Sequence, residues 1–248
     1  MNILIVATLL SVFSLWEISL LFSMALRRRE HTLGKIFLYE SRAISSIFSM
    51  FRAYRGFKVR VEKSFREPLP ERFIVVANHQ SLLDIPIIME NLPKGKHARF
   101  VAKKELSFGI PLISLLLRSG GHCLVKRRGD ALHAMRSISA MAKRCDKEGT
   151  IPVIFPEGTR SRTGDLGTFH SAGYRKILEV SPLPILVVAL EGGWSVVTLR
   201  DFFSNFGKKP YTIRFIGLLP APQGKREALA SLGKAREMIA GALDSMRG

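Results

Sequence analysis

A histidine and an aspartate lie five residues apart just after an apolar segment. Residues 72–77 predict a buried strand, and His79 and Asp84 follow it, where a strand ends and a helix begins. Along one continuous helix, five residues would place the two side chains about 140° apart. They can meet if the chain turns between them, with His79 on the turn and Asp84 in the first helical turn. The carboxylate would then hold one imidazole nitrogen and leave the other to act as a base.

The same residues also allow a purely structural explanation. Ser81 to Asp84 has the spacing of a helix capping box, with Ser81 as the N-cap and Asp84 in place of the usual glutamate. His79 would then be a loop histidine without a chemical role. A second strand end with matching chemistry favours catalysis.

That second segment carries polar side chains in a compact group. The apolar residues 150–155 predict another short strand. The residues that follow it are Pro156, Glu157, Gly158, Thr159 and Arg160. Proline and glycine are turn formers, which is the structural explanation of this segment. Arginine, however, can bind a phosphate in a bidentate manner, and glycine lets the backbone approach a ligand closely.

The two motifs together resemble those of the glycerolipid acyltransferases, and most closely the 1-acylglycerol-3-phosphate acyltransferases that make phosphatidic acid. The residues that carry the resemblance are Asn78-His79, four residues, Asp84, and then Phe155-Pro156-Glu157-Gly158-Thr159-Arg160-Ser161. The resemblance covers roughly residues 59 to 220. It implies that His79 and Asp84 are catalytic. The substrate-binding residues that it implies in the second motif are Glu157, Gly158, Thr159 and Arg160.

A weaker segment also resembles the family. Residues 121–127 match a block that ends in arginine, with Leu124 and Val125 in place of phenylalanine and isoleucine. These replacements keep an apolar strand. The resemblance therefore implies that Arg127 binds phosphate, and Arg128 could substitute for it.

Two further segments bear on the acceptor. Residues 100–106 look like a family segment and imply Lys103 or Lys104 as a phosphate contact, although a solvated charge cluster is the alternative. Residues 169–173 depart from the family pattern, because His170 stands where a lysine is common. This departure leaves the identity of the acceptor head group open.

The implied reaction moves an acyl group from a thioester to the hydroxyl of a lysophospholipid. His79 would take the proton of the hydroxyl, while Asp84 fixes the tautomer of the imidazole. The co-substrate would be acyl-CoA or acyl carrier protein, and no cofactor is implied. The sequence has no metal-ligand spacing, no Gly-x-Ser-x-Gly elbow and no phosphate-binding glycine loop, so we expect neither a metal nor an acyl-enzyme.

The N-terminal segment is a candidate membrane helix by length. Residues 3–26 are almost wholly apolar, with Glu17 as the one charge, and residues 27–29 are arginines. The acidic residue costs up to about 3.5 kcal/mol at a helix centre, whereas the apolar residues contribute about 4–8 kcal/mol. We therefore expect membrane association, by spanning or by embedding in one leaflet. The arginines would place the rest of the chain on the cytoplasmic side.

The next segment has the pattern of an amphipathic helix. Apolar residues recur at helical spacing over residues 33–55, with basic residues between them. Such a helix could lie in the membrane interface or pack on the domain. The usual role of N-terminal apolar helices in the family favours the interface.

The charge balance points to an anionic partner. The chain of 248 residues has 38 Lys and Arg against 20 Asp and Glu, a net charge of +18. No zinc finger, helix-turn-helix pattern or aromatic RNA-binding motif accompanies this charge, so we expect no nucleic acid partner. An anionic membrane explains both the charge and the apolar N-terminus.

The rest of the chain predicts an α/β fold in which helices flank a sheet. Further expected elements are helices over 130–148 and 225–246 and a strand over 211–219. The apolar segment 108–117 predicts core or the wall of an acyl groove. Mixed strand direction is implied by the resemblance. We divide the chain into membrane-associating helices over 1–58 and an acyltransferase domain over 59–248.

The expected function is therefore acylation of 1-acylglycerol-3-phosphate to phosphatidic acid in phospholipid biosynthesis. Another lysophospholipid or a lyso-aminolipid is the alternative acceptor. A non-catalytic, basic membrane-binding protein on the same scaffold is the alternative of another class.

Overall fold

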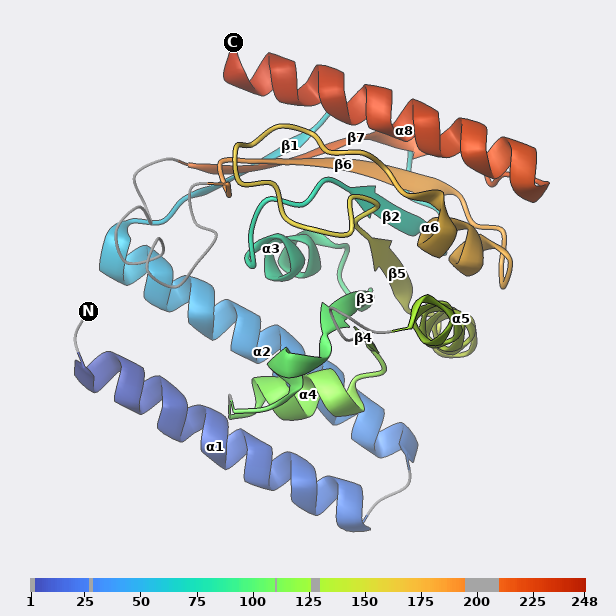
Figure 1. Cartoon of the computed structure of the whole chain (residues 1–248). Helices are drawn as coiled ribbons and strands as arrows, with labels where there is room; N and C mark the ends of the chain where they lie inside the picture. The colour runs from blue at the N-terminus through green and yellow to red at the C-terminus, as the bar shows by residue number, and fades with distance from the viewer. Residues whose placement is uncertain (1–2, 27–28, 110, 126–129, 195–209) are drawn as a thin grey trace.

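A mixed sheet forms the centre of the protein. The computed structural model describes residues 3–26, 29–109, 111–125, 130–194 and 210–248, and within them the strands form one seven-stranded sheet in the order β1-β7-β6-β2-β5-β3-β4 (Figure 1). The strands are β1 Val59–Lys63, β2 Ile74–Ala77, β3 Ala98–Lys103, β4 Cys123–Val125, β5 Ile151–Ile154, β6 Ile185–Glu191 and β7 Tyr211–Leu219.

The directions of the strands decide which loops meet. Five strands, β6, β2, β5, β3 and β4, run parallel to one another. β7 is antiparallel to β6, and β1 is parallel to β7. The mixed direction that the family resemblance implies is confirmed. The carboxyl ends of β2, β5, β3 and β4 therefore follow one another along a single edge of the sheet, about 4.8 Å apart from strand to strand.

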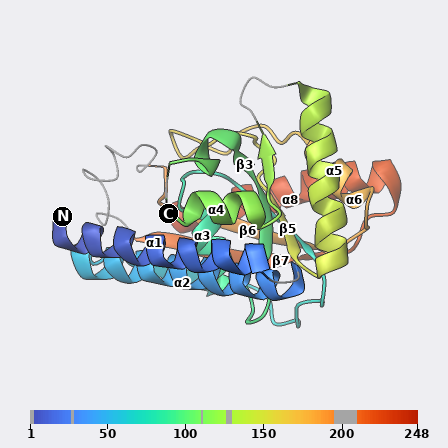
Figure 2. The ribbon, with the colours of Figure 1, turned by 90° about the horizontal axis from the view of Figure 1, so that it is seen from below.

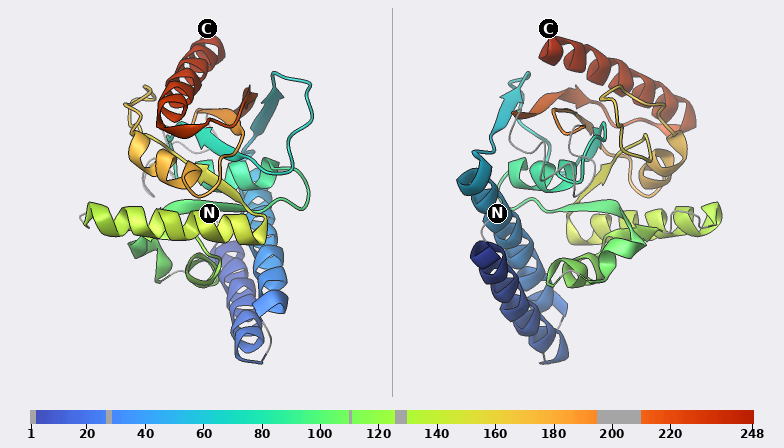
Figure 3. Two further views of the ribbon diagram at one scale, coloured as in Figure 1. Left: turned by 90° about the vertical axis from the view of Figure 1, so that its right-hand side faces the viewer. Right: turned by 60° about the vertical axis from the view of Figure 1, so that its left-hand side comes forward.

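Helices cover both faces of this sheet, which confirms the expected α/β architecture (Figures 1 and 3). The helices are α1 Ile3–Leu26, α2 Arg29–Arg55, α3 Asp84–Asn91, α4 Ile113–Ser119, α5 Ala131–Glu148, α6 Ser171–Leu178 and α8 Gly224–Arg247, with a short 3-10 helix η1 at Lys104–Ser107. α5, α6 and α8 pack on one face, and α2 and α3 pack on the other.

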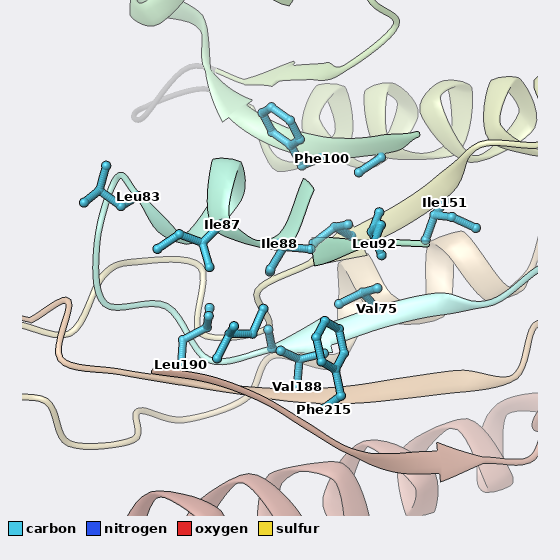
Figure 4. Close-up of a cluster of buried hydrophobic side chains, with 14 of the residues drawn as sticks. Val75, Leu83, Ile87, Ile88, Leu92, Phe100, Ile151, Val188, Leu190 and Phe215 are labelled. Atoms are coloured by element: carbon cyan, nitrogen blue, oxygen red, sulfur yellow. The ribbon is translucent and has the colours of Figure 1, made fainter. Parts of the chain in front are cut away.

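Alternation along the strands explains the two cores. In β2, Ile74 and Val76 join the core with α5, α6 and α8, whereas Val75 and Ala77 join the core with α2 and α3. Successive strand residues point to opposite faces, so an uninterrupted apolar strand must be covered on both sides. Figure 4 shows the second core, where Ile87 and other α3 side chains face the sheet.

The two N-terminal helices lie side by side along one border of the molecule (Figure 2). They form a third apolar cluster with α4, made of Phe13, Leu20, Ile36, Tyr39, Ala43, Leu112, Leu115 and Leu116. From the apolar segment 108–117, Leu112, Leu115 and Leu116 thus pack against α1 and α2, whereas Phe108 is exposed. Within the described part of the chain, none of the helices has the length and apolarity needed to traverse a bilayer.

The expected interfacial role of the apolar face of α2 is wrong. Phe48 and Phe51 are buried in the main core, where Phe48 stacks on Phe57 and Phe51 meets Phe57 edge-on, so this face packs on the domain. Periodicity identifies an apolar face but does not say what covers it. The boundary at 58/59 consequently marks the start of β1 and no break in the packing.

A buried ionic cluster ties α2 to the sheet. Arg99 of β3 is fully buried, and its guanidinium lies 3.3 Å from the Glu40 carboxylate of α2. Nε2 of His122 lies 3.1 Å from the same carboxylate. Burial lowers the pKa of His122, and its hydrogen bond to Glu40 opposes that shift. Since an unpaired buried arginine is costly, α2 is an integral part of the fold.

Candidate active site

The first motif occupies the turn between β2 and α3. His79 follows β2 and Asp84 is the first residue of α3, as the sequence predicts. Nδ1 of His79 lies 2.5 Å from Oδ2 of Asp84, and the two side chains are 17% and 0% exposed. An ionised carboxylate can only accept, so Nδ1 is the donor. Nε2 is left as the nitrogen that can take a proton from a substrate.

The Asp84 carboxylate also closes the turn. Its Oδ2 accepts hydrogen bonds from the backbone N–H groups of Gln80 at 2.6 Å and Ser81 at 2.9 Å. Asp84 therefore reaches back to the N–H of Ser81 as in a capping box, although the Ser81 hydroxyl accepts from Leu83 N, 3.3 Å away. The N-cap of α3 is Leu83 and no side chain caps the helix, so the expected capping box with Ser81 as the N-cap is wrong. The spacing instead lets Asp84 close the turn and hold His79.

Glu157 fastens the second motif to the first. It is 6% exposed, and its two carboxylate oxygens accept from His79 N at 2.7 Å and Gly167 N at 2.9 Å. Burial raises the pKa of Glu157, and these two backbone hydrogen bonds counteract the shift. The ring of Phe155 stacks on the His79 imidazole with 4.3 Å between centroids. The motif after β5 thereby fixes both the backbone and the ring of His79.

The rest of the second motif faces outward. Gly158 has a φ of +67°, which favours glycine, and a Cβ built there would meet no atom within 4 Å. Gly158 and Thr159 are exposed, and Arg160 is half-buried. The structure therefore brings these predicted substrate-binding residues beside His79, at the end of the strand that pairs with β2.

The predicted lysines lie on the next strand along the same edge. Lys103 ends β3 and is half-buried, and Lys104 begins η1 and is exposed. β3 pairs with β5 and with β4, which ends at Val125. Arg127 and its possible substitute Arg128 lie outside the described residues.

A polar network behind the catalytic turn was not predicted from the sequence. The Gln80 side chain donates to Glu191 at 3.0 Å and accepts from Gly193 N at 3.1 Å. Arg247 of α8 lies 2.8 Å from the same Glu191 carboxylate. Asn78 exchanges two 2.8 Å hydrogen bonds with the backbone of Leu190. These contacts lock the turn after β2 to the end of β6.

This fold and this strand-end site define a class of enzyme. The sequence model of the family described as "Acyltransferase" matches residues 58–191, and the chain belongs to that family.

Individual proteins similar to this chain have more specific names than the family. The chain is 37% identical to a 1-acyl-sn-glycerol-3-phosphate acyltransferase of Cocos nucifera, over 52% of this chain and 41% of that protein. It is 31% identical to the human 1-acyl-sn-glycerol-3-phosphate acyltransferase beta, over 64% of this chain and 54% of that protein. The chain thus spans about half the length of these relatives.

A solved structure shares the fold. It is the crystal structure of the 1-acyl-sn-glycerophosphate (LPA) acyltransferase PlsC from Thermotoga maritima, with a TM-score of 0.67 and 24% sequence identity. The match covers 100% of this chain and 96% of that one. At this identity the likeness shows the fold alone.

Proposed function

We propose that this protein transfers a fatty acyl group from an acyl thioester to the free hydroxyl of 1-acylglycerol-3-phosphate, which gives phosphatidic acid. The observation that carries the proposal is the short His79–Asp84 contact at the end of β2, beside the exposed Gly158 and Thr159 and the half-buried Arg160 at the end of β5. The names of the relatives support the same acceptor.

The residues suit a direct transfer. Nε2 of His79 takes the proton of the acceptor hydroxyl as its oxygen attacks the thioester carbonyl. The C–O bond forms, the C–S bond breaks, and the proton passes to the departing thiolate. Asp84 holds the imidazole and stabilises its charged form. The donor is acyl-CoA or an acyl carrier protein, and the step needs no cofactor.

A panel of acceptors tests the proposal. Purified protein with vesicles is offered lysophosphatidic acid, other lysophospholipids, a lyso-aminolipid and an uncharged monoacylglycerol, each with both thioester donors. We expect the highest kcat/KM with lysophosphatidic acid. A higher value for another lysolipid would move the proposal to that acceptor, and no transfer to any of them would leave the non-catalytic membrane-binding alternative.

We expect Arg160 to bind the acceptor phosphate. Replacing Arg160 with alanine should lower kcat/KM for lysophosphatidic acid about 10- to 100-fold, because a charge-assisted contact is lost. Arg160→Lys keeps the charge but loses the planar fork, so it should also weaken binding. The measurement compares lysophosphatidic acid with monoacylglycerol in each variant.

The matched control for this series is Arg162→Ala, an exposed arginine two residues further along. It should leave both substrates within about twofold of wild type, as for a solvated surface charge. An equal loss for both substrates in the Arg160 variants would show that Arg160 does not bind the phosphate.

We propose that α1 attaches the protein to an anionic membrane. Among the side chains of α1 that the structure describes, the exposed large apolar ones are Leu10, Leu15, Ile18, Leu21, Phe22, Met24 and Leu26. Glu17, the acidic residue of this helix, accepts a hydrogen bond from Leu112 N at 3.1 Å. Its carboxylate is therefore engaged by the protein, which lessens the cost of placing α1 against lipid. The net positive charge favours the cytoplasmic leaflet.

Substitution of the exposed face tests this attachment better than deletion, since α1 also packs through Phe13 and Leu20. The triple change of Leu15, Ile18 and Phe22 to glutamine should shift vesicle partitioning toward water about tenfold or more. Sedimentation with vesicles containing an anionic phospholipid measures this shift. The control is Leu229→Gln, an exposed leucine of α8, which should bind as wild type. Unchanged binding of the triple variant would place the attachment on another surface.

A further inference from the structure

A residue distant along the chain also binds Asp84. The hydroxyl of Tyr211, the first residue of β7, hydrogen-bonds to Oδ1 of Asp84. Both residues are buried, at 2% and 0% exposure. Because β7 runs antiparallel to β6, its first residue lies beside the carboxyl end of β6, at the edge that carries His79.

The position of the phenol is set by its neighbours. The Tyr211 ring packs against Phe57, with centroids 6.3 Å apart at an angle of 60°. The backbone of Gly193 covers the ring so closely that a Cβ there would lie 2.7 Å from both Cε2 and Oη of Tyr211. These contacts leave the ring little room to move, so packing fixes the position of the hydroxyl next to Asp84.

The two oxygens of Asp84 are thus bound by different elements. Oδ2 accepts from His79 and from the backbone of the turn after β2, and Oδ1 accepts from β7. The phenol is the donor, since an ionised carboxylate can only accept. Burial, and then the charge of Asp84, raise the pKa of Tyr211 well above its usual value, so the hydroxyl keeps its proton at neutral pH.

We propose that Tyr211 is a positioning residue for the acyl transfer, which fixes the rotation of the Asp84 carboxylate so that Oδ2 meets Nδ1 of His79. The inference rests on the proposed function. The hydroxyl also draws part of the negative charge of Asp84 toward itself. Without the hydroxyl, the rotation of the carboxylate is no longer fixed. More of its negative charge then faces the imidazole and stabilises the protonated form, so the base is available only at higher pH.

The test is Tyr211→Phe, which removes the hydroxyl and keeps the ring. We expect kcat to fall about tenfold or more, with KM for the lysolipid nearly unchanged, because the lost bond is one to a charged group. The acid side of the kcat/KM profile should move to higher pH. Two other titratable groups near this pair, Glu157 and Glu191, are the same in the variant.

Tyr174→Phe is the matched control. Tyr174 is a fully buried tyrosine of the opposite core, whose hydroxyl lies 2.8 Å from Ser231 Oγ. It should lose a comparable hydrogen bond without a change in kcat or in the pH profile beyond about twofold. Wild-type kcat and pH profile in Tyr211→Phe would overturn the proposal, as would the same loss in both variants.

Two further measurements separate this proposal from the proposed function. Gly193→Ala keeps the hydroxyl, but its Cβ would lie 2.7 Å from Oη of Tyr211 and 2.9 Å from Cβ of Ser81, so the phenol and the turn after β2 must shift apart. It should lower kcat and move the pH profile at least as much as Tyr211→Phe. The downfield proton resonance of Nδ1–H in His79, assigned by its absence in His79→Ala, should shift in Tyr211→Phe and stay in Tyr174→Phe. If the wild type acylates no acceptor, the proposed function fails, while an unshifted resonance would still overturn the role of Tyr211.

Discussion

Acyl transfer by His79→Ala is expected to fall by about 10²–10⁴-fold, the typical contribution of a positioned general base. The imidazole lies at the end of β2 with Nδ1 held by Asp84, so its removal takes away the group that accepts the proton of the hydroxyl. Steady-state assay of purified variant with lysophosphatidic acid and both thioester donors measures the effect. KM should change much less than kcat.

Folding should survive this substitution, because the His79 side chain is partly exposed on a turn. Thermal unfolding and vesicle binding are measured beside the activity. The control is His133→Ala, an exposed histidine of α5, which should keep full activity. Turnover of His79→Ala within about threefold of wild type would contradict the assignment of His79 as the base.

Asp84→Asn is expected to lose nearly as much activity and to lose stability as well. The carboxylate is fully buried and accepts from His79, Gln80, Ser81 and Tyr211. In asparagine, an NH2 group replaces one of the two accepting oxygens and faces groups that also donate. This favours the wrong tautomer of His79 and leaves buried polar groups unsatisfied. We expect a loss of about 10³–10⁴-fold in kcat and of about 2–4 kcal/mol in the free energy of unfolding.

The same chemical change at the surface is the control. Asp146 forms an exposed ion pair with Arg72, 2.6 Å long, and Asp146→Asn should change stability little and activity not at all. Denaturant unfolding and steady-state kinetics are compared for the two variants. A stable, fully active Asp84→Asn would mean that this carboxylate neither orients His79 nor organises the turn.

Glu157 shows how the geometry refines a family motif. The resemblance implies that Glu157 binds substrate, whereas its two oxygens are occupied by the backbone N–H groups of His79 and Gly167. A buried carboxylate with both oxygens engaged suits the positioning of a loop better than contact with an anionic phosphate. The exposed Gly158 and Thr159, together with Arg160, are better placed for substrate.

The positions of the site residues at strand ends could be predicted from local sequence. His79 and Asp84 follow an apolar strand, and the turn after residues 150–155 carries the arginine, so both groups were expected at strand ends. The ends of strands and helices were also predictable, because caps and apolar periodicity depend on residues adjacent in sequence. An example is Gly149, which ends α5 in the left-handed conformation. These signals extend over one or two turns of chain.

Only the tertiary structure decides which of these ends become neighbours. The pairing of β2 with β5 brings Glu157 to His79, and the return of β7 beside β6 brings Tyr211 to Asp84 across 127 positions of the chain. Neither contact leaves a periodic trace in the sequence, because it depends on strand order and not on local spacing. The outward face of α1 was likewise decided by packing: an almost wholly apolar helix has no preferred side until Phe13 and Leu20 bury one of them.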